Sequence, residues 1–264
     1  MKKVIILSMC LILSLSLFGC GIKNKIKNSL TNEETNNEQI IENNVSNYYD
    51  YDINFDMKVN EVAKITDNST LEYLGEKSVY GNNEDCYKIE LKDLKINFIL
   101  PNNIINTKYE LVNSINDISL TNNKDFDKTF IMNNSNMFTL IKPSGYYIIA
   151  SEVNTDDNFN KTLENSYSTG AFVYLFNGSF ISIVEGSETF INEQNGIYYA
   201  LCDVNIMPYI NDPTLSYSGR AIFYSDKNVV KFLIVGTSNF SYDYNSSYSI
   251  CNYIVSSSNV TFSY

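Results

Sequence analysis

Turn sequences between segments rich in β-branched and aromatic residues constrain this chain more than any other feature. Asn177-Gly178 separates two such segments, and this dipeptide favours a type I′ turn because both central positions need a positive φ. Pro143-Ser144-Gly145 separates another pair in the same way. The sequence therefore predicts antiparallel hairpins. Their strands are expected at 171–176 with 180–184 and at 137–142 with 146–153.

Further segments have the same strand-like composition. Residues 86–92 alternate polar and apolar side chains, as a half-buried strand does. Residues 94–100 follow and end at Pro101-Asn102-Asn103. The pattern continues at 196–204 and at 221–235, where Asp226-Lys227-Asn228 interrupts it.

Helices are predicted to be fewer than strands. The strongest helical pattern runs over 242–256, where Tyr244, Tyr248, Cys251 and Val255 recur at spacings of 4, 3 and 4 and form one apolar stripe. Weaker helical patterns cover 59–66 and 159–166. Hairpins with a few flanking helices predict an α+β fold built on an antiparallel sheet.

The composition excludes several kinds of chemistry. The chain has no His, so Ser-His-Asp and Cys-His catalysis and His-ligated zinc are excluded. Its formal net charge is −11, which argues against a nucleic-acid partner because such proteins carry a basic footprint. No G-x-S-x-G, S-x-x-K, P-loop or G-x-G-x-x-G motif occurs. We therefore expect neither an enzyme nor a cofactor.

The N-terminus has the pattern of an export signal. Lys2 and Lys3 precede an uncharged apolar stretch over 4–18. A spanning helix needs about 20 apolar residues, so this stretch fits a cleaved signal better than a permanent anchor. Loss of residues 1–19 removes both lysines and no acidic residue, which changes the net charge from −11 to −13.

Leu17-Phe18-Gly19-Cys20 directly follows the apolar stretch and resembles the lipobox of bacterial lipoproteins. The resemblance implies that Cys20 becomes the mature N-terminus and carries acyl chains such as palmitate. Two acyl chains hold a protein stably on a bilayer. We therefore expect a lipid anchor in the cell membrane, facing the extracytoplasmic side. The alternative is an ordinary secretory signal in which Cys20 is incidental.

Three regions follow from these patterns. Residues 1–19 are the predicted signal peptide, and 20–50 are a polar tether with a reach of about 25 to 30 Å by random-coil scaling. Residues 51–264 are expected to form a single α+β ectodomain. Over 86–264 the order of an early strand, paired hairpins and a closing helix resembles the PsbP-like α/β/α sandwich. That resemblance implies a role in assembly or interaction.

The cysteines leave two alternatives open. Once Cys10 is removed with the signal and Cys20 is lipidated, Cys86, Cys202 and Cys251 remain. Three residues allow one disulfide, for which Cys202 with Cys251 is the favoured pair. Sparse cysteines without a pattern are also typical of buried core thiols.

Two acidic clusters are candidate cation sites. The first has calcium-loop spacing, but Phe55 stands where such a loop needs Gly, and Tyr51, Ile53 and Phe55 alternate as in a strand. The second cluster also has no such Gly. We expect a strand end and a solvated loop, without a metal. The two clusters are Asp50, Asp52, Asn54, Asp56 and Glu61, and Asn154, Asp156, Asp157, Asn158 and Asn160.

Three side chains are candidate ligand contacts. Tyr147 and Tyr199 belong to adjacent tyrosine pairs, in which one ring is expected to face the core and the other a surface that could stack on a sugar. Arg220 is the only guanidinium and could pair with an acidic neighbour or hold a carboxylate ligand. Glu185 and Glu188 are spaced no differently from ordinary surface charge.

These observations predict a membrane-anchored extracytoplasmic lipoprotein that binds or scaffolds a protein partner at the cell envelope. The alternative is a binding module for a small ligand, a sugar or a cation.

Overall fold

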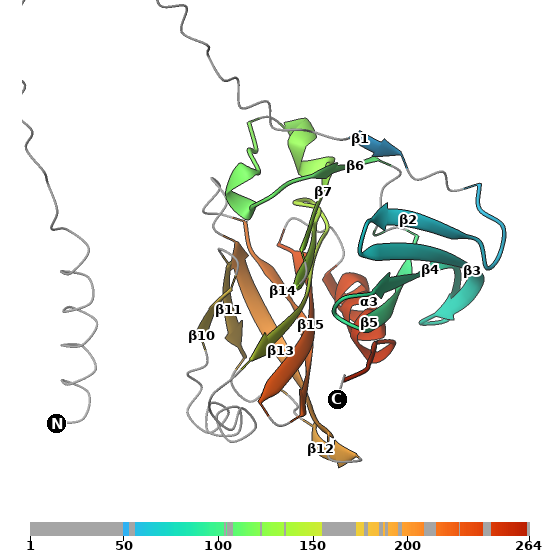
Figure 1. Cartoon of the computed structure of the whole chain (residues 1–264). Helices are drawn as coiled ribbons and strands as arrows, with labels where there is room; N and C mark the ends of the chain where they lie inside the picture. The colour runs from blue at the N-terminus through green and yellow to red at the C-terminus, as the bar shows by residue number, and fades with distance from the viewer. Residues whose placement is uncertain are drawn as a thin grey trace, which may run out of the picture. The chain divides into compact units, whose positions relative to one another are not determined.

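Strands dominate the described part of the chain (Figure 1). The computed structural model describes residues 50–52, 56–102, 104, 108–121, 123–134, 136–154, 173–176, 179–184, 187, 190–194, 197–208, 215–226, 228–239 and 244–262. Residues 46–264 form one compact unit. Within the described residues, one α-helix, α3 (Tyr244–Ser256), lies between two sheets and packs on both of them.

Among the described residues, the larger sheet has eleven strands. Its order is β1-β6-β7-β8-β9-β15-β14-β13-β11-β10, and β12 also pairs with β13. Neighbouring strands are antiparallel except β6 and β7, which are parallel and are joined through the 3₁₀ helices η1 (Ile115–Asp117) and η2 (Asn123–Asp127). The strands are β1 (Asp50–Asp52), β6 (Lys108–Leu111), β7 (Thr129–Asn134), β8 (Met137–Ile141), β9 (Tyr146–Asn154), β10 (Val173–Phe176), β11 (Ser179–Ile183), β12 (Phe190–Gln194), β13 (Ile197–Pro208), β14 (Tyr217–Asp226) and β15 (Val229–Ser238).

The smaller sheet has five antiparallel strands in the order β16-β5-β4-β3-β2. The hairpin of β3 and β4 is its longest pairing, and a bulge beside Gly75 interrupts the register. β16 follows α3 directly and pairs with β5, so the end of the chain returns to this sheet. The strands are β2 (Val62–Thr66), β3 (Ser69–Val79), β4 (Asn82–Leu91), β5 (Ile96–Pro101) and β16 (Asn259–Val260).

The predicted hairpins and the C-terminal helix are confirmed. β8 and β9 pair around Pro143-Ser144-Gly145. β10 and β11 pair from Val173 with Ser182 to Phe176 with Ser179, and Asn177-Gly178 lies outside the described residues. α3 ends at Ser256 as predicted and begins two residues after the predicted start at 242.

The helix predicted at 59–66 is wrong. Residues 59–60 form a turn and β2 begins at Val62, where it pairs with Glu72 of β3. Pairing with β3 stabilises the extended conformation of this β-branched segment. That stabilisation outweighs its weak local preference for a helix. The second weak helix, at 159–166, lies outside the described residues. The described residues are therefore mostly strand, and they contain fewer helices than the α+β prediction expected.

Both faces of the larger sheet are covered, which gives two hydrophobic cores. Along β9, Tyr146, Ile148 and Ala150 face a core shared with the smaller sheet and α3, whereas Tyr147 and Ile149 face a second core on the opposite side. This is the period of two expected for a strand. The two tyrosines do point to opposite sides, but both are buried, so neither ring lies on a surface.

Candidate functional site

A polar cleft of about 410 Å³ lies between the turn joining β2 to β3 and the adjacent strands β6 and β7. The turn belongs to the smaller sheet and the two strands belong to the larger one, so the cleft exists only where the two sheets meet. Its volume is in the range typical of small-ligand sites. Its lining residues are Lys64, Ile65, Thr66, Asp67, Asn68, Leu111, Val112, Asn113, Ile131 and Asn133.

Hydroxyl groups at both ends of the β2–β3 turn fix its shape. Thr66 and Ser69 are a cross-strand pair, and their hydroxyl oxygens lie 2.6 Å apart. The backbone N–H of Asn68 donates to Thr66 Oγ1 at 3.3 Å. The carbonyl of Asn68 accepts from the backbone N–H of Lys92 at 2.9 Å, which ties the turn to the end of β4.

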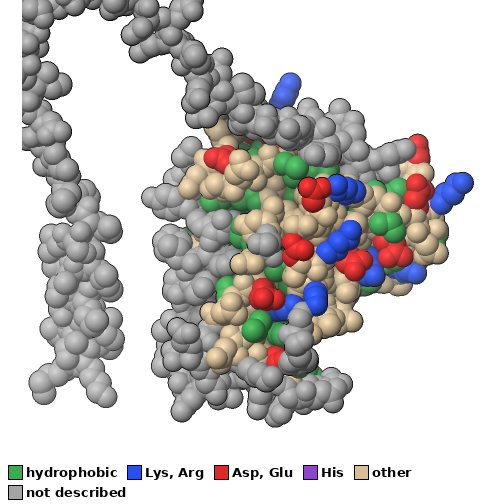
Figure 2. Space-filling view, viewed as in Figure 1, with side chains coloured by type: hydrophobic (Ala, Val, Ile, Leu, Met, Phe, Trp, Pro, Cys, Tyr) green, Lys and Arg blue, Asp and Glu red, His purple; other side chains and the backbone are tan. Residues whose placement is uncertain are grey.

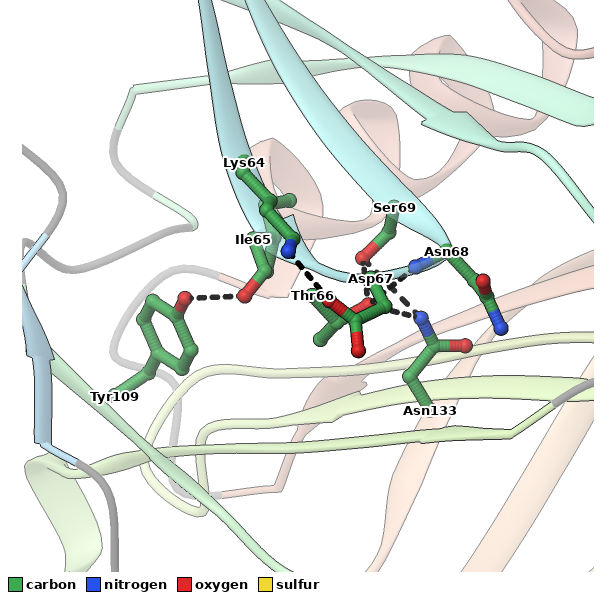
Figure 3. A network of polar contacts seen from close by, with 8 residues as sticks. All are labelled: Lys64, Ile65, Thr66, Asp67, Asn68, Ser69, Tyr109 and Asn133. Carbon is green, nitrogen blue, oxygen red and sulfur yellow. Dashed lines mark hydrogen bonds and ion pairs between the residues drawn. The ribbon is translucent and has the colours of Figure 1, made fainter.

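Side chains of the larger sheet hold this turn in place (Figure 3). The amide nitrogen of Asn133, on β7, donates to Thr66 Oγ1 and to Ser69 Oγ, the latter at 3.2 Å. The hydroxyl of Tyr109, on β6, donates to the carbonyl oxygen of Ile65 at 2.7 Å, and the Tyr109 side chain is buried. These contacts connect the two sheets at the cleft, so its walls are fixed before any ligand arrives.

The charges at the mouth of the cleft neutralise each other. Lys64 Nζ and Asp67 Oδ1, three positions apart in the sequence, form an ion pair. The hydrogen bond and charge of Lys64 lower the pKa of Asp67 below its ordinary value. Both side chains are largely exposed, so the pair contributes little to stability. The described lining residues therefore present one hydroxyl and three amide groups and carry no net charge.

A second cavity, of about 330 Å³, contains Tyr199. Tyr199 on β13 and Tyr224 on β14 are a cross-strand pair. The Tyr224 hydroxyl donates to the Ser258 carbonyl at 3.3 Å and lies 3.0 Å from Ser258 Oγ, so the segment after α3 forms one wall. Burial raises the pKa of Tyr224. The lining residues are Ile197, Tyr199, Ile222, Tyr224, Ser258, Asn259 and Val260.

Arg220 is paired with an acidic neighbour. It lies opposite Asp203 in the β13–β14 register and forms an ion pair with it, and the Tyr248 hydroxyl of α3 donates to the same carboxylate oxygen. Burial alone would lower the pKa of Arg220, but hydrogen bonds to Asp203 and Tyr248 outweigh it and raise the pKa. Of the two roles predicted for Arg220, the structure supports the pairing.

Tyr147 lies in the second core, fully buried. Its hydroxyl is 2.7 Å from Ser179 Oγ, and its ring packs edge-on against Tyr217 at a centroid distance of 5.4 Å. Burial raises its pKa.

The structure does not bring the three candidate contacts together: Tyr147 is in a core, Arg220 is in an ion pair, and Tyr199 lines a cavity. Cys20 lies outside the described residues.

The acidic clusters are only partly described. Asp50 and Asp52 belong to β1, which pairs with β6 as the alternating pattern predicted, and Glu61 accepts the backbone N–H of Lys58 at 2.8 Å. Asn54 lies outside the described residues, as do positions 156–160 and both Glu185 and Glu188. Among the described residues no group of three His, Cys, Asp or Glu side chains could hold a metal ion.

The cysteine alternatives are resolved in favour of thiols. Cys86, Cys202 and Cys251 are buried and form no disulfide. Burial raises the pKa of the Cys86 and Cys251 thiols. The expectation of buried core thiols is confirmed for these three residues, and the alternative of a bridge between Cys202 and Cys251 is not.

Sequence reasoning missed the three asparagines of the polar cleft, Asn68, Asn113 and Asn133. They come from three different strands or turns, and asparagine is abundant throughout the chain. Neither spacing nor composition therefore distinguishes them, and only the contact between the sheets brings them together.

No family model, curated protein or solved structure matches the chain. Its resemblances to bacterial lipoproteins and to PsbP-like domains therefore stay predictions from the sequence. In the part of the chain that the structure describes, no helix has the length and apolar character needed to span a membrane.

Proposed function

We propose that this protein is a lipid-anchored extracytoplasmic lipoprotein that binds a protein partner at the cell envelope and catalyses no reaction. The observation that carries the anchoring is Leu17-Phe18-Gly19-Cys20 directly after a lysine-led apolar stretch. Diacylation of Cys20 would hold the protein on the membrane, since two chains anchor stably where one is marginal.

Replacement of the anchoring sulfur tests this proposal. Cys20→Ser is expected to move the protein from the detergent phase to the aqueous phase in a cloud-point partition and to remove the acyl mass from its N-terminal peptide. Cys10→Ser is the matched control, because Cys10 lies in the predicted signal and is removed with it. If both variants partition with the detergent like the wild type, Cys20 is not the anchor.

The polar cleft supports the binding part of the proposal. It combines hydroxyl and amide groups with an apolar floor and has no net charge, which suits reversible recognition. On the face drawn in Figure 2, the basic side chains of the described residues lie next to acidic ones, an arrangement that does not favour nucleic acid.

Crosslinking on intact cells tests for the partner. A photo-reactive residue in place of Asn113, at the cleft, is expected to yield one reproducible protein adduct. The same residue in place of Asn116, exposed on η1, is not expected to yield that adduct. Equal adducts from both positions, or none from Asn113, would contradict partner binding at this cleft.

A second candidate function is saccharide binding, favoured by the Tyr199–Tyr224 cavity. Two tyrosines beside a serine and an asparagine offer both an aromatic face and hydroxyl-compatible groups. Calorimetric titration with chitotriose would test it, and Tyr199→Ala is expected to abolish the heat of binding. No heat with the wild-type protein would remove this candidate.

A further inference from the structure

We propose that the polar cleft binds an uncharged, extended main-chain segment of the partner, and that the side-chain amides of Asn68, Asn113 and Asn133 form the hydrogen bonds to it. This inference rests on the proposed binding of a protein partner and names the part of the partner that is recognised.

The three amides retain hydrogen-bonding capacity toward the cleft. Among the described residues, the side chains of Asn68 and Asn113 have no hydrogen-bond partner. Asn133 uses only its nitrogen, which donates to Thr66 and Ser69. Figure 3 shows the oxygen of Asn133 turned away from these two hydroxyls, and the Asn68 amide projects away from them as well.

The chemistry of an amide side chain matches that of a peptide group. An asparagine presents one carbonyl acceptor beside an NH₂ donor, and a peptide unit presents the complementary N–H and C=O. Because an extended segment points these groups outward at regular intervals, amides from several positions can bind it at once. Asn133 lies on β7 and Asn113 lies in the bend two residues after the end of β6, whose last residue, Leu111, pairs with Ile131 of β7.

The floor of the cleft and its charge favour the same ligand. Ile65 and Ile131 are buried beneath it and Leu111 is half-buried, which suits a small apolar side chain between two main-chain contacts. Lys64 and Asp67 are paired with each other, so neither selects a charged ligand.

The absence of aromatic rings from the lining separates this cleft from the tyrosine cavity. None of the residues described as lining it is aromatic, whereas Tyr199 and Tyr224 line the other cavity. Saccharides gain much of their affinity from stacking on rings, and main-chain segments do not need it. The two cavities thus suit different chemistry, and this one suits a peptide.

The walls are also fixed in advance. Asn133, Thr66 and Ser69 form one hydrogen-bonded group between the sheets, and the Ser69 residue is fully buried. A site that is ordered before binding loses less conformational entropy when the ligand arrives. A few neutral hydrogen bonds can therefore give measurable affinity.

The test is a selection of random displayed peptides on the purified full chain in detergent, followed by calorimetry with a capped synthetic copy of the enriched peptide. Asn113→Ala is expected to weaken binding about threefold to tenfold, the value of one neutral hydrogen bond. Asn116→Ala is the control and leaves affinity unchanged. Methylation of the peptide's backbone nitrogens is expected to abolish binding.

Asn113 is the primary position because its exposed side chain has no contact that folding requires, whereas Asn133→Ala also removes bonds between the sheets. Enrichment of no peptide, or equal affinity for the wild type and Asn113→Ala, would overturn the inference. Competition by chitotriose would also overturn it, because the ligand would then be a saccharide. Anchoring through Cys20 and the cellular crosslink are measured separately, so failure here leaves those results standing.

Discussion

Replacement of Lys231 tests how the end of the chain is held against the two sheets. Lys231 is on β15 and its side chain is only 3% exposed. Its ammonium donates to the carbonyl oxygens of Leu94 (2.5 Å) and Thr261 (2.9 Å), lies 3.1 Å from Glu152 Oε2 and stands 5.3 Å from the ring centre of Phe262. One cation thus joins β9, the β4–β5 turn and the segment after α3.

Lys231→Met keeps most of the side-chain volume and removes the charge. It leaves two backbone carbonyls without their donor and Glu152 without its partner. A buried carbonyl left without its donor costs about 1 to 3 kcal/mol, so loss of both hydrogen bonds is expected to cost about 3 to 5 kcal/mol in total. Glu152→Gln is expected to cost only about 1 kcal/mol, because its side chain is 34% exposed and water can replace part of the lost interaction. The double variant is expected to lose less than the sum of the two.

Urea unfolding of the full chain, followed by far-ultraviolet circular dichroism, measures these differences. For a domain of this size, the expected loss for Lys231→Met corresponds to about 6 to 20 °C in Tm. Lys64→Met is the control, because Lys64 is exposed and its ion pair with Asp67 lies at the surface, and it is expected to change stability by less than about 0.5 kcal/mol. If Lys231→Met destabilises no more than Lys64→Met, the cation does not hold the C-terminal segment.

Three further predictions concern packing, alkaline pH and the thiols. Gly219→Ala is expected to destabilise by more than about 2 kcal/mol, because a Cβ there would lie 2.0 Å from the carbonyl oxygen of Val235; denaturant titration checks this, and a near-neutral result would show that the strands can separate. The pKa of Tyr248 is raised from 10.0 to about 12, mainly by burial and to a lesser extent by its hydrogen bond to Asp203. Its contribution to stability is complete below pH 10 and is lost as the pH rises toward 12, so Tyr248→Phe should flatten the stability profile over that range, and parallel profiles would contradict it. All three cysteines of the described region are buried thiols, so they should react with a thiol reagent only after denaturation, and rapid reaction of the native protein would show that one of them is accessible.

Local features of the sequence were enough to predict the hairpins and the last helix. Asn177-Gly178 and Pro143-Ser144-Gly145 specify turns through their backbone preferences, which do not depend on distant residues. The 4-3-4 spacing of Tyr244, Tyr248, Cys251 and Val255 likewise predicts α3. Where the local signal was weak, as at 59–66, pairing with β3 decided the conformation and the prediction was wrong.

The candidate sites depended on contacts that no local pattern encodes. Tyr199 was predicted as a ligand contact and does line a cavity, but its partner Tyr224 and the wall at Ser258 come from elsewhere in the chain. Tyr147 was predicted as a ligand contact because adjacent tyrosines on a strand point to opposite sides, and one of the two was expected on a surface. The larger sheet is covered on both faces, so that residue is buried.

The sequence by itself determined the strand-rich character, the turns and the closing helix, because these follow from backbone preferences and from the period of apolar residues over a few neighbours. It also determined the exclusion of histidine chemistry. Only the tertiary structure decided which face of each strand is buried, that Arg220 is paired, and that three asparagines meet in one cleft. These depend on which sheet packs against which, and that is fixed by burial summed over the whole domain.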